Sequence, residues 1–407
     1  MKITEIRQIL KDTDYVRTSG SPQELKAAEY LKARCEEKGM AARIEAFPVA
    51  MSELQESHLY VDGKEIPCRG SLLCGSGEVE APLYHMPGTD RISIAGAKGK
   101  IVLLERPGMQ YFLYKDLYEA GAVGFITCNG DVNHPHRDIN QQELRPHVAE
   151  GKKMLCANIN VKDAVEIVKG GGKSAKLVVK QKEYQGESHN VIAEIPGETD
   201  KWIVLSAHYD STFLSRGSYD NMTGCIGILG IAEALMKTAP NRMGIRLIFC
   251  GSEERGLLGA KAYCRDHEAE LADIGLDINI DMIGTIMGRF LACVSAEEKL
   301  VGYIEYLGAE LGWGIESKNG VYSSDSTPFA DKGVPSLSFA RIAGGNIAPI
   351  HNRYDTMKVL SAQQIQRDID FMSLFTSRMA NAAVFPVRRE IPQSVRDELD
   401  KYLNRKR

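Results

Sequence analysis

Mainly apolar runs of strand length recur through the second half of the chain. They are NVIAEI (190–195), WIVLSA (202–207), IRLIFC (245–250) and LDINID (276–281). Between and after them, segments 222–238, 257–270 and 361–385 have apolar residues at helical spacing. Buried strands that alternate with helices predict an α/β fold, in which helices cover both faces of the sheet.

The N-terminal part begins with a well-marked helix. Residues 21–38 open with Ser21 and Pro22, place Leu25 and Leu31 on one face, and end at Gly39. The segment AARIEAFPV that follows predicts a strand over 41–49.

A different pattern occupies residues 50–185. Short β-rich runs at 101–105 and 123–127 flank a segment with helical spacing, and a strand, a helix and a strand follow to residue 181. We therefore expect a β-rich domain inserted here. The parts before and after it, 1–49 and 186–388, would form the main domain, and 389–407 a C-terminal tail with a solvated basic end.

Composition restricts the partners and the compartment. The formal net charge of −4 and the isoelectric point near 6.2 argue against nucleic acid or an anionic membrane as a partner. Charged residues interrupt the first twenty positions, and no run approaches the ~18 apolar residues of a membrane span. Nine cysteines without CxxC spacing indicate reduced thiols and a cytoplasmic protein.

Histidines are the first place to look for a metal site. Five of the nine lie in the inserted block, at 58, 85, 134, 136 and 147. His134, His136 and His147 share a polar stretch with two prolines, and no strand end brings carboxylates to them. We interpret that stretch as a solvated loop.

A second group of candidate ligands follows the apolar strands. His208 comes after 202–207, Glu253–Glu254 follow 245–250, and Asp281 ends 276–281. Open α/β sheets bind ligands at the carboxyl ends of their strands, so these side chains should meet. Asp210, Asp220 and His351 complete the group.

Each of these residues also has a purely structural interpretation. Asp220 could cap the following helix, and Glu253–Glu254 could complement a helix dipole. Asp281 could be a hydrogen-bonded structural acid, and His351 a solvated loop residue. Together, however, they supply two imidazoles and several carboxylates, a donor set that suits zinc or a related divalent ion.

At this point the motifs AHYDS, YDNMTG, GSEERGLLGA, INIDMIG and IHNRYDT resemble the co-catalytic zinc aminopeptidase family, whose relatives include glutamate carboxypeptidase and glutaminyl cyclase. The inserted block, notably residues 99–130, resembles a protease-associated (PA) domain. The resemblance implies a zinc-exopeptidase-like fold with a mixed, mostly parallel sheet. It also implies an aminopeptidase that acts on peptides with a free N-terminus.

The resemblance further implies separate roles for the candidates. His208 and Asp281 would bind one divalent ion, Glu254 and His351 a second, and Asp220 would bridge the two. Glu253 would be the general base and acid, and Asp210 would orient His208. The ions are expected to be zinc, two per chain, and the peptide bond after Asp220 is often cis in the family.

Two departures from the family pattern concern the substrate pocket. Ile350 stands where many relatives have Tyr, and Ser326 where they often have His. A carboxypeptidase or dipeptidase, a glutaminyl cyclase and a non-catalytic receptor-like homologue therefore remain alternatives. A carboxypeptidase would need a cationic group for the substrate carboxylate, for which only Arg341 and Arg353 are close in sequence. A homo-oligomer stays open.

Overall fold

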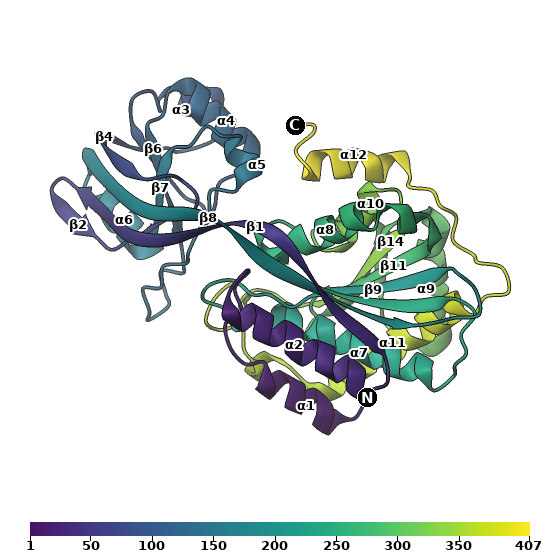
Figure 1. The fold of residues 1–407 in the computed structure, drawn as a ribbon. Coiled ribbons are helices and arrows are strands. Elements are labelled where there is room, and N and C mark those ends of the chain that lie inside the picture. Colours follow the sequence, from purple (N-terminus) through teal and green to yellow (C-terminus); the bar gives the residue numbers. More distant parts are fainter. The chain divides into compact units, whose positions relative to one another are not determined.

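The computed structural model describes residues 1–407, which divide into two compact units (Figure 1). The first consists of Met1–Val49 and Glu187–Lys406, and the second of Ala50–Gly186 with the last residue. Two long strands, β1 (Ala41–Val61) and β8 (Ser174–Ile195), cross the boundaries between them. The strand expected over 41–49 is therefore present, but it continues into the second unit.

The first unit contains a mixed sheet in the order β13-β12-β14-β11-β9-β10-β8. Neighbours β10–β9, β9–β11, β11–β14 and β12–β13 are parallel, whereas β12–β14 and β10–β8 are antiparallel. This confirms the predicted mixed, mostly parallel sheet. The strands are β9 (Trp202–His208), β10 (Gly244–Cys250), β11 (Ile274–Ile280), β12 (Arg289–Ser295), β13 (Glu316–Asn319) and β14 (Ser336–Ile342).

Helices cover both faces of this sheet because successive strand residues point to opposite faces. Ile203 and Leu205 of β9 pack into one apolar cluster and Val204 into another. The first cluster includes residues of α1 (Ile3–Asp12), α2 (Pro22–Glu37), α7 (Thr223–Met236), α9 (Glu298–Leu311) and α11 (Ala362–Ala380). The second includes residues of α8 (Leu258–Asp266) and α10 (Ser326–Asp331).

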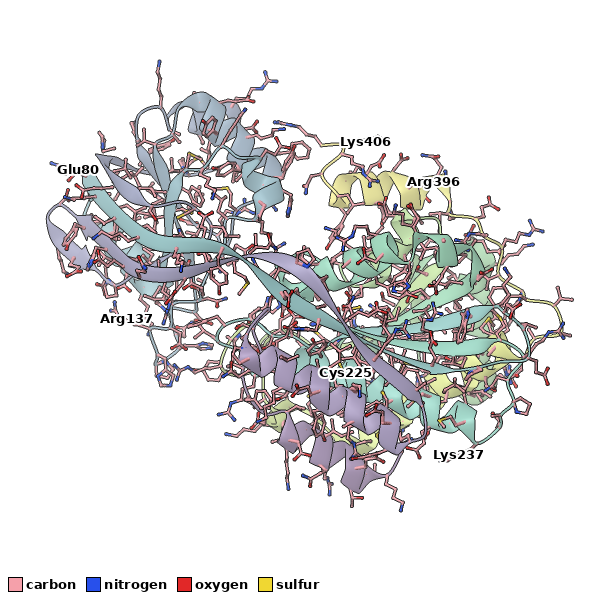
Figure 2. The ribbon with its side chains drawn as sticks, viewed as in Figure 1. Glu80, Arg137, Cys225, Lys237, Arg396 and Lys406 are labelled. Atoms are coloured by element: carbon pink, nitrogen blue, oxygen red, sulfur yellow. The ribbon has the colours of Figure 1, made fainter.

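Helix α7 is buried on almost all sides, because it packs between the sheet and helix α11. Eleven of its fourteen residues are buried, among them Cys225 at the interior of the unit (Figure 2). The segment that contains Asp220 directly precedes Thr223, the first residue of α7. It lies at the edge of the sheet where β9 and β11 end.

The C-terminal segment differs from the expected tail. It contains helix α12 (Gln393–Tyr402), whose Val395 and Leu399 are buried in a small cluster with Ala330 of α10. These two apolar residues lie four positions apart and therefore share one face of the helix. The basic end remains exposed, although Arg405 pairs with Asp331.

The second unit has its own sheet, in which β4, β5, β6 and β7 are parallel neighbours. The side chains of α4 and α6 belong to different apolar clusters, one for each face. The elements are β2 (Lys64–Ile66), β3 (Arg69–Gly70), β4 (Gly77–His85), α3 (Arg91–Ala95), β5 (Ile101–Leu104), α4 (Tyr111–Ala120), β6 (Gly124–Asn129), α5 (Pro146–Ala149), β7 (Leu155–Asn160) and α6 (Val161–Lys169).

None of the helices combines the length and the apolar character that a helix needs to cross a bilayer.

Candidate metal centre

Two of the candidate ligands are held at the carboxyl ends of neighbouring parallel strands. His208 is the last residue of β9, and Asp281 directly follows β11. The backbone N–H of Asp281 donates to Phe339 O, which extends the pairing of β11 with β14 by one residue. His208 Nε2 lies 3.6 Å from Asp281 Oδ1, and both residues are buried.

Asp220 lies between these residues and the start of α7. It belongs to a short irregular turn, Ser218–Met222, and the peptide bond from Asp220 to Asn221 is cis. The cap position of α7 is occupied by Met222. The interpretation of Asp220 as a helix cap is therefore wrong.

Glu253 and Glu254 lie on a turn that is separate from helix α8. The turn Glu253–Arg255 follows β10 and is bounded by Ser252 and Gly256, both with positive φ. The two acids therefore do not belong to the first turn of α8. They stay close to the carboxyl end of β10, where their side chains are only 11% and 10% exposed.

His351 comes from the loop after β14. Its side chain is 48% exposed, which agrees with the interpretation of His351 as a solvated loop residue. Its Nε2 nevertheless lies 3.0 Å from Asp220 Oδ2 and 3.2 Å from Glu254 Oε2.

The candidate ligands form two groups that share one residue. In the first group the ligand atoms of His208, Asp220 and Asp281 lie within 4.8 Å of one another, and in the second those of Asp220, Glu254 and His351 do. The two oxygens of Asp220 face different imidazoles, since Oδ1 lies 3.1 Å from His208 Nε2. The histidines of the second unit belong to neither group.

Asp210 connects the first group with the Glu253–Glu254 turn. Its carboxylate is fully buried and lies 3.5 Å from His208 Nδ1. It also accepts hydrogen bonds from the backbone N–H groups of Glu253 and Glu254, at 2.9 and 3.3 Å. Asp210 can therefore fix the positions of both acids as well as that of the imidazole.

Asp355 is a residue of the site that the sequence pattern did not reveal. This buried carboxylate accepts hydrogen bonds from Tyr219 N at 2.7 Å, Asp220 N at 3.2 Å and Ser215 Oγ at 3.0 Å. It lies four residues after His351, so it ties the loop of one imidazole to the backbone of Asp220.

Two further side chains hold the ligand-bearing segments together. Asn221 donates to Ile280 O and accepts from Met282 N, which fixes the segment of Asp281 beside that of Asp220. Arg17 is fully buried and donates to the carbonyls of Tyr209, Arg216 and Gly217, in the loop between His208 and Asp220. Neither role could be read from the sequence, because each contact joins residues far apart in the chain.

The cluster concentrates buried negative charge. Burial, followed by the charge of Asp220, raises the pKa of Glu254 to about 7. Burial also raises the pKa of Glu253 well above its usual range, and it raises the pKa of Asp325, the residue before α10, to about 7. Burial disfavours the charged form of His208, but the nearby carboxylates of Glu253, Asp210, Asp220 and Asp281 raise its pKa nonetheless.

A divalent cation fits this environment. Several carboxylates share a small buried volume with two imidazoles, and Asp281 Oδ1 is buried there without a hydrogen-bond donor. Buried carboxylates that lack donors are costly unless a cation compensates them. Nitrogen and oxygen donors in two three-residue groups suit zinc and related first-row ions.

Metal affinity at this site is expected to rise with pH. A ligand must lose its proton before it binds a metal, and the pKa values of His208, His351 and Glu254 are all raised. Protons therefore compete more strongly at pH 6 than at pH 8, by about tenfold per pH unit for each proton displaced. Zinc titrations against a competing chelator at constant ionic strength measure this slope, and a pH-independent affinity would contradict it.

The chain is similar to known peptidases. Residues 190–376 match Peptidase family M28. Aminopeptidase YwaD of Bacillus subtilis is 27% identical over 88% of this chain and 80% of its own length. Leucine aminopeptidase 2 of Arthroderma otae is 32% identical over 47% of this chain and 38% of its own. The solved structure of BSAP, a zinc aminopeptidase from Bacillus subtilis, shares the fold, with a TM-score of 0.77, 24% identity and 97% of both chains covered.

Proposed function

We propose that this chain, whose residues 190–376 match peptidase family M28, is a metal-dependent aminopeptidase that hydrolyses the first peptide bond of peptides with a free N-terminus. The observation that carries the proposal is the pair of three-residue donor groups that share Asp220, with Glu253 beside them. The aminopeptidases to which the chain is similar support the same reaction.

The residues of the two donor groups would bind the metal ions. His208, Asp220 and Asp281 would hold one divalent ion, and Asp220, Glu254 and His351 a second, both expected to be zinc. When bound, such ions polarise the scissile carbonyl and lower the pKa of water from 15.7 toward about 7.

Glu253 acts as the general base and acid. Its carboxylate lies 3.9 Å from His208 Nε2, beside the donor groups but outside both of them. It takes the proton from the attacking water as the water oxygen adds to the carbonyl carbon, and it transfers that proton to the nitrogen of the leaving amine. Burial raises the pKa of this carboxyl group, so it holds a proton more firmly than an exposed carboxylate does.

The negative charge of the buried carboxylates explains why the enzyme would act at the N-terminus of a peptide. A free N-terminus is an ammonium, which the buried carboxylates attract, whereas an acylated N-terminus carries no charge. The opposite specificity would require a cation that binds the substrate carboxylate. Arg341, one of two arginines close enough in sequence, is instead bound to buried Asp368 through hydrogen bonds of 2.6 and 2.9 Å. Because the charge of Arg341 is already neutralised by Asp368, this arginine is a poor site for a substrate carboxylate. The pairing therefore favours an aminopeptidase over a carboxypeptidase.

The substrate class is tested with matched peptides. Leucylglycylglycine is expected to be cleaved with a kcat/KM at least about 10- to 100-fold higher than N-acetyl-leucylglycylglycine, since a charge-assisted contact contributes about 1.5–3 kcal/mol. Chromatography of the products shows which bond is cut. Faster cleavage of the acetylated peptide, with release of the C-terminal glycine, would instead establish a carboxypeptidase.

The role of Asp355 is tested by the substitution Asp355→Asn. Asparagine has only one acceptor oxygen for the three donors at this position, so the backbone of Asp220 is expected to shift. Loss of a partner behind a metal ligand lowers metal affinity or activity by about 10- to 100-fold. We expect kcat and zinc affinity to fall in this range while KM changes little, with the exposed Asp200→Asn as the control. Unchanged zinc binding and kcat would remove Asp355 from the site.

Two further assignments belong to this proposal. The nine cysteines form no disulfide, which suits a reducing compartment such as the cytoplasm.

We also assign Ala50–Gly186 to the PA domains, on the resemblance of residues 99–130.

A further inference from the structure

The second unit contains a cavity that is built entirely from its own residues. It has a volume of about 650 Å³ and lies where β4, β5 and β6 end, beside α6. Leu103, Cys128 and Ala164 are buried at this cavity, and Val161 and Val165 of α6 also line it. Cavities of this size with mainly apolar walls and a few polar groups are typical of sites for small organic ligands.

The polar groups of this cavity differ in whether they already have partners. His85 Nε2 lies 3.0 Å from Glu105 Oε1, so these two side chains pair with each other. Asn129 Oδ1 accepts hydrogen bonds from Asn140 N and from Asn158 Nδ2. Neither the pair nor the amide oxygen therefore needs a ligand.

Arg106 is the exception. Arg106 lines the cavity and forms no ion pair with a carboxylate, and its Nε is buried without a protein acceptor. Burial lowers the pKa of Arg106, and no acidic group opposes this effect. A partly buried cation without an acceptor is unfavourable, and a carboxylate is its best partner because two N–H groups can bind two oxygens.

The charge around the cavity has the matching sign. Lys169 at the end of α6 is a second cation of the lining, whereas the only acid, Glu105, is paired with His85 and its side chain is 80% exposed. An anion would therefore meet net positive charge in this cavity, and the rest of the lining is mainly apolar.

We propose that this cavity binds an apolar carboxylate, with the carboxylate on Arg106 and the apolar part against Leu103, Cys128 and α6. Such a group occurs at the C-terminus of an apolar peptide and in a medium-chain fatty acid. The site does not depend on the proposed peptidase activity, because none of its residues belongs to the metal centre.

Calorimetric titration of the full chain tests the site with two pairs of probes. N-acetyl-leucylleucine and octanoate carry the carboxylate, and their amides lack it. The acids are expected to bind at least about tenfold more tightly than the amides. A charge-assisted hydrogen bond between the carboxylate and Arg106 would raise the affinity by about this factor. Whichever acid binds more tightly identifies the source as a peptide or a fatty acid.

Three variants show whether binding occurs at this cavity. Arg106→Gln is expected to weaken binding of the acids by about tenfold or more, and Arg91→Gln, which removes an exposed cation from the same unit, should leave it unchanged. Val168→Asp adds a negative charge at an exposed position of the lining, so it should weaken binding without loss of folding. Equal binding of acids and amides, no binding of either acid, or unchanged binding to both Arg106→Gln and Val168→Asp would overturn the proposal.

Discussion

Replacement of Glu253 by glutamine is expected to lower kcat by about 10²- to 10⁴-fold, the usual contribution of a general acid and base. Glutamine keeps the size of the side chain and can still form hydrogen bonds, but it cannot take a proton from water. Because Glu253 lies outside both donor groups, zinc content and the folded structure should stay the same. KM should change little, since the substrate contacts remain.

Steady-state kinetics on leucylglycylglycine, together with metal analysis of the same protein, measure this effect. Glu29→Gln removes an exposed carboxylate from helix α2 and serves as the matched control. A Glu253→Gln enzyme that retains its zinc and still hydrolyses the peptide at the wild-type rate would exclude Glu253 as the base. Loss of zinc in this variant would instead make Glu253 a ligand.

Replacement of Asp220 by alanine is expected to remove both ions and with them the activity. Asp220 is the one residue shared by the two donor groups, and each of its oxygens faces a different imidazole. Changes to hydrogen-bond partners behind a ligand already lower metal affinity by about 10- to 100-fold, so loss of a ligand to both ions should exceed that range. Replacement of His351, by contrast, should weaken only one ion.

Thermal unfolding offers a second measurement of the same change. Zinc that binds only the folded protein stabilises it by about 4 kcal/mol per site at 1,000 times Kd. The wild-type Tm should therefore rise with zinc, and that rise should disappear in Asp220→Ala and persist in the exposed Asp200→Ala. An equal rise in all three proteins would mean that zinc binds elsewhere.

The positions of the candidate ligands at the ends of strands could be predicted from local pattern. Mainly apolar runs of strand length mark β9, β10 and β11, and the polar residue that follows each of them lies at the same edge of the sheet. His208, Glu254 and Asp281 were found in this way, and the fold class followed from the same pattern. The proposed division of these residues between two ions rests on the family resemblance, because the spacing of the residues does not predict it.

The supporting contacts could not be predicted, because they depend on tertiary proximity. Asp355 and Asp220 are 135 residues apart in sequence, and Arg17 and Tyr209 are 192 apart. A buried arginine or aspartate has no periodic pattern that distinguishes it from a solvated one. Helix α12 is different, since Val395 and Leu399 do have helical spacing, although a tail was expected over 389–407.

The central claim is that two ions share Asp220, and anomalous diffraction from zinc-loaded crystals at the zinc absorption edge tests it most directly. We predict two peaks in the first unit, about 3.5–4 Å apart. One should be bound by His208 and Asp281, the other by Glu254 and His351, with one oxygen of Asp220 on each. A single peak, or two peaks without Asp220 between them, would contradict this account.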